Sequence, residues 1–191
     1  MAETMKVWLR PHPTTALTSV VSIRVYVERR GADILFLTWI VAGKISEIAW
    51  PGTAASGFEG WERGDELWQH TCFEAFGRAD NLPGYAEFNI ATSARWAAYR
   101  FADYRQGMRP LEDVRFEMGR WFLRERQAKV ETALTLPSEF GAETWHLGLA
   151  AVIEEKSGAR SYWALHHPDP AKPDFHDPAC FTATLAAPRG S

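Results

Sequence analysis

Short runs in which apolar and polar residues alternate recur along this chain. The clearest spans residues 127–136 (QAKVETALTL), where Val130 and Leu134 fall on one side of the alternation and Glu131 and Thr135 on the other. Successive side chains of a β-strand point to opposite faces, so this period of two indicates half-buried strands. Gly, Pro, Asn, Asp and Ser separate the runs, as turns require.

About ten strands and little helix are expected. The strand-like runs cover residues 17–29, 34–42, 45–50, 67–76, 85–91, 96–101, 113–124, 127–136, 144–154, 160–165 and 179–185. The first two should form a hairpin, and 67–76 and 85–91 should be antiparallel neighbours. Residues before 17 are interpreted as a turn-rich leader and 53–65 as a loop, whereas 92–108 also fits a helical stripe.

This pattern predicts a single domain over residues 1–191, an all-β antiparallel sandwich of jelly-roll type or a partly closed barrel.

The composition excludes some classes of function. The 191 residues carry a formal net charge of −3, so the chain lacks the positive field with which proteins bind nucleic acids. No stretch approaches the ~20 apolar residues of a membrane span, and no secretory signal is recognisable. We therefore expect a cytoplasmic protein. Cys72 and Cys180 lie far apart in the sequence, which is not the pattern of a disulfide framework.

The stretch LWQHTCFEAF, residues 67–76, places polar groups inside an apolar run. If it is a strand, His70, Cys72 and Glu74 share one face. A buried carboxylate is costly unless it is paired or faces a cleft. Two interpretations remain open: a structural network joining Glu74 to Arg105 or Asn89, or a ligand site.

Nucleophilic and metal chemistry have weaker support. Cys72 could pair with His70, but a free cysteine more often packs in a core. The residues considered as metal ligands are His70, Cys72, Glu74, His166, His167, Asp174 and His176, with Asp33, Asp65, Glu66, Asp80 and Asn81 as loop ligands for calcium. None of them has the repeated short spacing of a metal site.

Nine tryptophans favour a third chemistry, in which flat aromatic groups stack on a sugar and polar groups ring its edge. The aromatic candidates are Trp61, Trp68, Trp96, Tyr99 and Trp163, and the polar ones are Gln69, Glu74, Glu87, Asn89, Arg100 and His176. Each tryptophan could equally fill the core.

Three segments carry a resemblance to a known family: LWQHTCFEAF, YAEFNIATSARWAAYRFADYRQGM and YWALHHPDPAKPDFHDPACF. They resemble small bacterial proteins of the DOMON-like superfamily, which are similar to family 9 carbohydrate-binding modules. The resemblance implies a β-sandwich with a ligand site at one sheet, for sugars in the carbohydrate modules and for haem in some other members. Calcium or haem is implied by this analogy alone, so no cofactor is predicted.

A non-enzymatic domain that binds a small carbohydrate is therefore our leading hypothesis, with no catalytic residue assigned. The predicted ligand-binding residues are Trp68, His70, Glu74, Asn89, Trp96, Tyr99, Arg105, Trp163, Asp174 and His176. The alternatives are a hydrolase that uses His70, Glu74 and His176 in acid–base work, and a scaffold whose exposed aromatic surface binds proteins.

Overall fold

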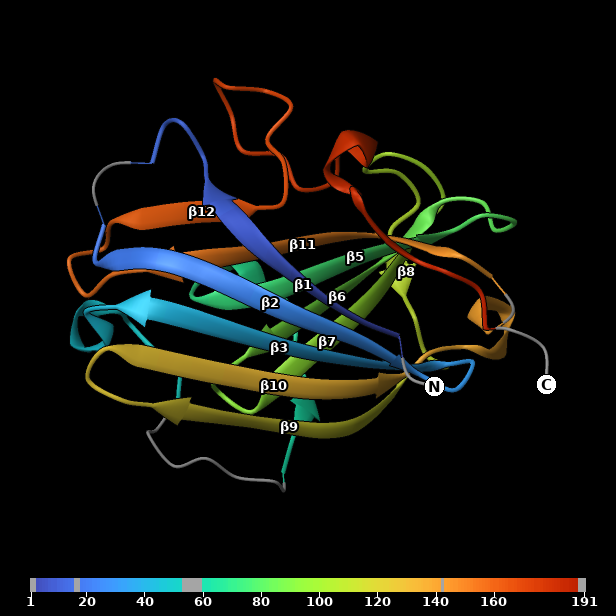
Figure 1. The fold of residues 1–191 in the computed structure, drawn as a ribbon, viewed down its shortest axis with the longest axis horizontal. Helices are drawn as coiled ribbons and strands as arrows, with labels where there is room; N and C mark the ends of the chain where they lie inside the picture. The colour runs from blue at the N-terminus through green and yellow to red at the C-terminus, as the bar shows by residue number, and fades with distance from the viewer. Residues whose placement is uncertain (1–2, 16–17, 53–59, 142, 189–191) are drawn as a thin grey trace.

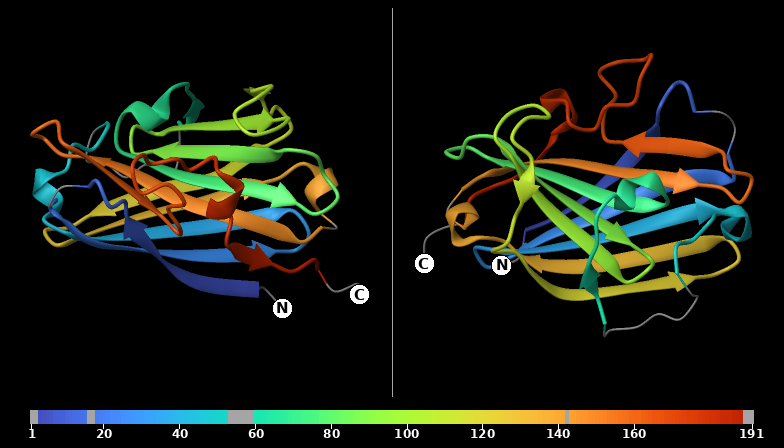
Figure 2. Two further views of the ribbon diagram at one scale, coloured as in Figure 1. Left: turned by 90° about the horizontal axis from the view of Figure 1, so that it is seen from above. Right: turned by 180° about the vertical axis from the view of Figure 1, so that it is seen from behind.

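The computed structural model describes residues 3–15, 18–52, 60–141 and 143–188. Thirteen strands and four 3-10 turns form in these ranges, without an α-helix. The prediction of an all-β sandwich with little helix is confirmed, and its two layers are visible in Figure 2. No helix in the described ranges is long and apolar enough to cross a membrane.

Sheet A is the front layer in Figure 1 and is antiparallel throughout. In order across the sheet, its strands are β1 (Glu3–Pro11), β2 (Val20–Arg30), β3 (Ile34–Gly43), β10 (Gln127–Thr135) and β9 (Arg115–Leu123). The predicted hairpin of β2 and β3 is confirmed, with Val25 opposite Trp39.

Sheet B lies behind sheet A in Figure 1. Its strands, in order, are β4 (Glu62–Arg63), β7 (Arg95–Phe101), β6 (Tyr85–Ala91), β5 (Cys72–Ala79), β11 (Trp145–Glu154) and β12 (Arg160–Ala164), with β8 (Arg109–Pro110) beside β7 and β13 (Ala183–Leu185) beside β11. The predicted antiparallel pairing of β5 with β6 is confirmed. The pairing of β4 with β7 is parallel, so the sheet is not purely antiparallel as expected.

Strand β1 joins the two sheets. Its residues 3–9 pair with β2, whereas Arg10 and Pro11 pair with β12. Figure 1 shows β1 crossing the front of the molecule obliquely between these partners. The two layers are therefore one curled sheet, connected at one side.

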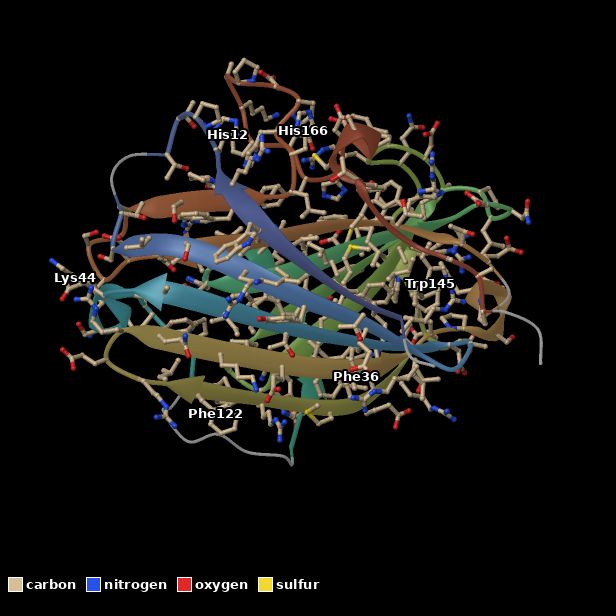
Figure 3. The ribbon with its side chains drawn as sticks, viewed as in Figure 1. His12, Phe36, Lys44, Phe122, Trp145 and His166 are labelled. Carbon is tan, nitrogen blue, oxygen red and sulfur yellow. The ribbon has the colours of Figure 1, made fainter. Side chains whose placement is uncertain are left out.

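The main core lies between the layers. Trp39 of β3 and Phe73 of β5 are both fully buried, and their ring centroids are 5.6 Å apart. Burial of such apolar surface is the main favourable contribution to folding, at about 25 cal/mol per Å². Phe36 and Phe122, by contrast, project from the solvent-facing side of sheet A (Figure 3).

Several predicted element bounds were wrong. Residues before 17 are not a turn-rich leader, because Pro11 ends β1 rather than interrupting it. The expected strand 45–50 is a 3-10 turn, η1 (Ile45–Glu47), followed by an isolated bridge at Ile48. The expected strand 67–76 begins with the turn η2 (Leu67–Gln69), so β5 starts only at Cys72.

The remaining differences lie near the ends of strands. The expected strand 179–185 begins with the turn η4 (Pro178–Cys180), which leaves three residues for β13. A fourth turn, η3 (Ser138–Phe140), precedes β11. The helical alternative for 92–108 was wrong, since β7 occupies 95–101 as a strand. Most of the expected loop, at 53–59, lies outside the described residues.

Gly119 of β9 has no room for a side chain. A Cβ there would lie 2.4 Å from the Trp61 ring and 2.5 Å from the Phe116 ring. We expect Gly119→Ala to lower the free energy of unfolding by about 1–3 kcal/mol, because overpacking displaces these stacked rings. Urea denaturation measures the change. Gly77→Ala is the control, since its Cβ would meet only Leu147 at 3.5 Å. Equal losses in the two variants would contradict the packing described here.

Candidate functional site

The outer face of sheet B, turned away from sheet A, carries polar side chains at its centre. In β5, Phe73 packs into the main core, so its neighbour Glu74 points outward together with Phe76. The register places Asn89 of β6 opposite Glu74, and Glu87 opposite Phe76. Glu74 and Glu87 are therefore diagonal neighbours on one face, which brings their side chains within reach of each other.

Three segments partly cover this face: the turn η2, the loop 102–108 between β7 and β8, and the segment 165–182 after β12 (Figure 2). A cleft of about 440 Å³ remains between them. Its lining consists of Trp68, Gln69, Glu74, Glu87, Phe101, Arg105, Met108, Val152, Arg160, Tyr162, Pro173, Phe175 and His176. A volume of this size falls within the range of small-molecule sites.

The floor of the cleft is formed by two buried carboxyl groups. Glu74 and Glu87 are 3% and 4% exposed. The side-chain amide of Asn89 donates a hydrogen bond to Glu87 Oε1 at 2.7 Å. Glu74 Oε1 has no hydrogen-bond partner among the described residues. Buried polar atoms are almost always hydrogen-bonded, so this oxygen is the atom of the cleft that most needs a partner.

Both carboxyl groups hold protons more tightly than usual. Burial raises the pKa of Glu74 well above its ordinary value, and the nearby charge of Glu87 raises it further. Burial raises the pKa of Glu87 to about 7, although the Asn89 hydrogen bond and the charge of Arg105 lower it in part. Two neighbouring buried carboxylates repel each other, so the pair retains a proton near neutral pH.

Arg105 and Asp174 form an ion pair at the rim. Arg105 adopts a left-handed backbone conformation, with φ of 52°, and its Nη2 donates to Asp174 Oδ1 at 2.9 Å. The Tyr104 hydroxyl also donates to Asp174. Burial alone would raise the pKa of Asp174, but these hydrogen bonds and the arginine charge hold it below its ordinary value. This contact ties the loop 102–108 to the segment 165–182.

His176 is held in one orientation by Tyr85. The backbone N–H of Arg105 donates to the Tyr85 hydroxyl oxygen at 3.2 Å. The same hydroxyl lies 2.8 Å from His176 Nδ1, and we assign the hydroxyl proton to this contact. The imidazole hydrogen is then on Nε2, which faces Glu87 Oε2 at 3.8 Å. Burial and the Arg105 charge lower the pKa of His176 to about 4. His176 is therefore a neutral donor that points toward the carboxyl pair.

The protonation of His176 can be tested directly. We expect its ring to stay neutral down to about pH 4, with the hydrogen on Nε2, because Nδ1 accepts from Tyr85. Long-range ¹H–¹⁵N NMR distinguishes the two tautomers and follows the titration. Tyr85→Phe should relax the tautomer preference. A protonated Nδ1 at pH 7 would show that the arrangement is wrong.

Aromatic rings flank the cleft. Trp68 lies edge-on to Tyr99 with centroids 6.0 Å apart, and the Tyr99 hydroxyl donates to Asp65 at 2.7 Å. Tyr162 and Phe175 also line the cleft, and their ring centroids are 6.3 Å apart. Trp68 and Tyr162 are only half-buried, so they present partly accessible aromatic surface beside the carboxyl pair.

Seven of the ten predicted ligand-binding residues gather at or behind this cleft. Trp68, Glu74, Arg105 and His176 line it. Asn89, Tyr99 and Asp174 support the lining through Glu87, Trp68 and Arg105.

The other three predicted residues lie elsewhere. Trp96 and Trp163 fill the main core instead of forming platforms: Trp96 stacks on Phe116, and Trp163 donates to Ser161 Oγ. His70 is not on the strand, because η2 precedes it; its side chain is 63% exposed and contacts Glu154 at 2.7 Å. Trp61, also considered as a platform, stacks on Phe116 beside the core.

The sequence did not point to several residues of the lining, among them Phe101, Val152, Arg160, Tyr162, Pro173 and Phe175. Tyr162 alternates with the core residue Trp163 along β12, so the period of two could have placed it on the outer face. Phe175 lies in an irregular segment, where no periodicity predicts its direction.

The donor groups do not match the cofactors implied by family analogy. Within the described ranges, no three His, Cys, Asp or Glu side chains come together as a metal site. Met108 and His176 both line the cleft, but the two ring nitrogens of His176 face Tyr85 and Glu87. Two buried carboxyl groups also contrast with the apolar surroundings that suit a haem ring. Neither Met108 nor His176 is positioned as an axial haem ligand.

No known protein-family pattern and no curated protein sequence matches this chain. Among solved structures, a candidate carbohydrate-binding protein from Bacteroides uniformis shares the fold with a TM-score of 0.58 and 15% identity, over 94% of this chain and 86% of that one. Two structures of a family 9 carbohydrate-binding module from Caldicellulosiruptor kristjanssonii are also similar at 12% identity. The complex with glucose has a TM-score of 0.45, over 84% of this chain and 74% of that one. The complex with cellotriose has a TM-score of 0.47, over 92% and 79%. At these identities, the likeness to the Bacteroides uniformis protein shows the fold of this chain.

Proposed function

We propose that this chain binds a saccharide in the cleft on the outer face of sheet B. The observation that carries the proposal is Glu74, which lines the cleft and whose buried Oε1 has no hydrogen-bond partner among the described residues. A ligand hydroxyl that donates to this oxygen would remove the cost of leaving it unpaired, which is about 1–3 kcal/mol.

The other groups of the cleft suit the chemistry of a sugar ring. Glu87 and the Nε2–H of His176 provide an acceptor and a donor close to Glu74. Trp68 and Tyr162 offer flat apolar surface for the C–H face of the ring. Sugars combine these two kinds of surface, whereas a purely apolar ligand would leave the carboxyl groups buried without partners.

Two further findings agree with the proposal. A solved structure with the same fold is described as a candidate carbohydrate-binding protein. The sequence also resembles DOMON-like proteins over the segments that supply Trp68, Glu74, Arg105 and His176.

Calorimetric titration with mono- and disaccharides, both neutral and amine-bearing, tests the proposal. Glu74→Ala should weaken binding by roughly 10- to 100-fold, because the ligand group that donates to Glu74 would lose its partner, at a cost of about 1–3 kcal/mol. Glu47→Ala is the control, since Glu47 is exposed in η1, outside the cleft lining. The absence of binding for every saccharide, or equal affinities for the two variants, would contradict the proposal.

A second function is favoured by one specific observation. Glu74 and Glu87 are paired carboxyl groups in an open cleft, and the raised pKa of Glu87, about 7, suits a general acid. Glycoside hydrolysis uses two carboxyl groups in this way. The hydrolase considered from the sequence would have used His70, which lies outside the lining of the cleft. Release of nitrophenol from aryl glycosides, lost in both Glu74→Gln and Glu87→Gln, would establish this activity over simple binding.

A further inference from the structure

The charged groups around the cleft are unevenly paired. Arg105 is held by Asp174 at 2.9 Å, and Arg160 lies 3.6 Å from Glu154. These contacts provide each arginine with its own carboxylate. Glu74 and Glu87 remain as a pair of acids whose described hydrogen bonds include only one donor, the neutral amide of Asn89.

We propose that the saccharide recognised by this cleft carries a primary ammonium group, as a 2-amino sugar does, and that this ammonium binds between Glu74 and Glu87. The inference rests on the proposed saccharide-binding function and adds the chemical class of the sugar. An ammonium group supplies three N–H donors and a positive charge, so it can satisfy Glu74 Oε1 and the second carboxyl together. A sugar hydroxyl supplies one neutral donor.

Binding of the ammonium is coupled to release of a proton. Without ligand, the two carboxyl groups together retain one proton, because burial and mutual repulsion disfavour two charges. An ammonium ion between them stabilises both carboxylates, so the proton leaves to the buffer. The balance is one cationic sugar bound and up to one proton released; no covalent bond forms or breaks.

Around the carboxyl pair, Glu74 and Glu87 themselves are the groups whose ionisation can change near neutral pH. The titratable and charged groups that face it are Cys72 of β5, Tyr85 of β6, Tyr99 of β7, Arg105 of the loop 102–108, Arg160 of β12, and Asp174 and His176 of the segment 165–182. Burial raises the pKa of the Cys72 thiol and of the Tyr85 and Tyr99 hydroxyls, which keeps them neutral. Arg105 opposes an incoming cation, but Asp174 neutralises it at close range.

Calorimetry with three matched sugars tests the inference: glucosamine, N-acetylglucosamine and glucose. Glucosamine should bind at least about tenfold more tightly than the other two, because only it carries the ammonium. Repeating the titration in buffers of different ionisation enthalpy should show proton release with glucosamine alone. Its affinity should rise between about pH 5 and pH 7, because Glu87 loses its proton over this range and only the proton on Glu74 remains for the ammonium to displace.

Glu87→Gln provides the matched variant. It keeps the size of the side chain and an oxygen acceptor for Asn89, and it should abolish both the proton release and the preference for glucosamine. Proton release by the unsubstituted chain is an independent readout if this variant does not fold. Binding of glucose or N-acetylglucosamine as tightly as glucosamine, without proton release, would overturn this inference and leave the proposed function standing. Binding of no saccharide at all would overturn both.

Discussion

Glu87→Gln should become about 3 kcal/mol more stable, relative to the unsubstituted chain, as the pH is raised from about 4.5 to 8. The reason is the burial of Glu87, whose side chain is 5% exposed and whose pKa is raised from 4.5 to about 7. A difference of this size between the folded and unfolded chains corresponds to about 3 kcal/mol. Glutamine has no proton to lose and therefore avoids the cost of a buried charge.

The sign of this pH dependence follows from the number of protons that Glu87 binds in the folded and in the unfolded chain. Between pH 4.5 and 7, the folded chain binds more protons at Glu87 than the unfolded chain, so the contribution of Glu87 to stability decreases with pH and then levels off. His176 acts in the opposite direction. Its folded pKa of about 4 lies below the ordinary 6.5, so its contribution increases with pH between these values. The two effects largely cancel in the unsubstituted chain.

Urea denaturation of both chains at several pH values measures the difference. Glu47→Gln, at an exposed position, is the control and should follow the unsubstituted chain at every pH. A constant difference between Glu87→Gln and the unsubstituted chain from pH 4.5 to 8 would mean that Glu87 ionises in the folded state as it does in water. The proton-linked account of the cleft would then be wrong.

Phe73→Ala should lower the free energy of unfolding by about 3–5 kcal/mol, because it leaves a cavity between the two sheets. The Phe73 ring is fully buried, 5.6 Å from Trp39 and 6.4 Å from Trp50 between ring centroids. Removal of the ring therefore affects contacts from both layers of the sandwich.

Phe122→Ala is the matched control, because Phe122 is 41% exposed on the outer face of sheet A (Figure 3). It should cost less than about 1 kcal/mol, since surface substitutions have small effects. Urea or thermal denaturation measures both variants. Similar losses for Phe73→Ala and Phe122→Ala would contradict the assignment of the core to the space between the sheets.

Alternation in the sequence predicted the sheets well where one face of a strand is polar. The strands β2 and β10 are examples. The pattern failed where local backbone geometry changed within an apolar run. Directly before LWQHTCFEAF, Glu66 adopts a left-handed conformation, and within it the His70 N–H donates to the Leu67 carbonyl oxygen at 3.3 Å. These contacts form a turn, which a count of apolar residues cannot distinguish from a strand.

The sequence predicts less about which face of sheet B is turned toward sheet A. Both faces of β7 are apolar, and the sequence correctly separates Trp96 from Tyr99 by alternation. It does not say which face packs against sheet A and which borders a cleft, because that depends on strands far away in the sequence. Trp96 was therefore predicted as a sugar platform although it belongs to the core. Glu74 lies in the lining of the cleft, as the need of any buried carboxyl group for a partner or a cleft suggested, and its role as a ligand-binding residue stays a prediction.

A crystal structure of the chain with a bound saccharide tests the central claim most directly. The account predicts a sugar ring in the cleft on the outer face of sheet B, beside Trp68 and Tyr162, with a polar hydrogen donated to Glu74 Oε1. A saccharide bound at another surface, with Glu74 Oε1 still unpaired under saturating ligand, would contradict it.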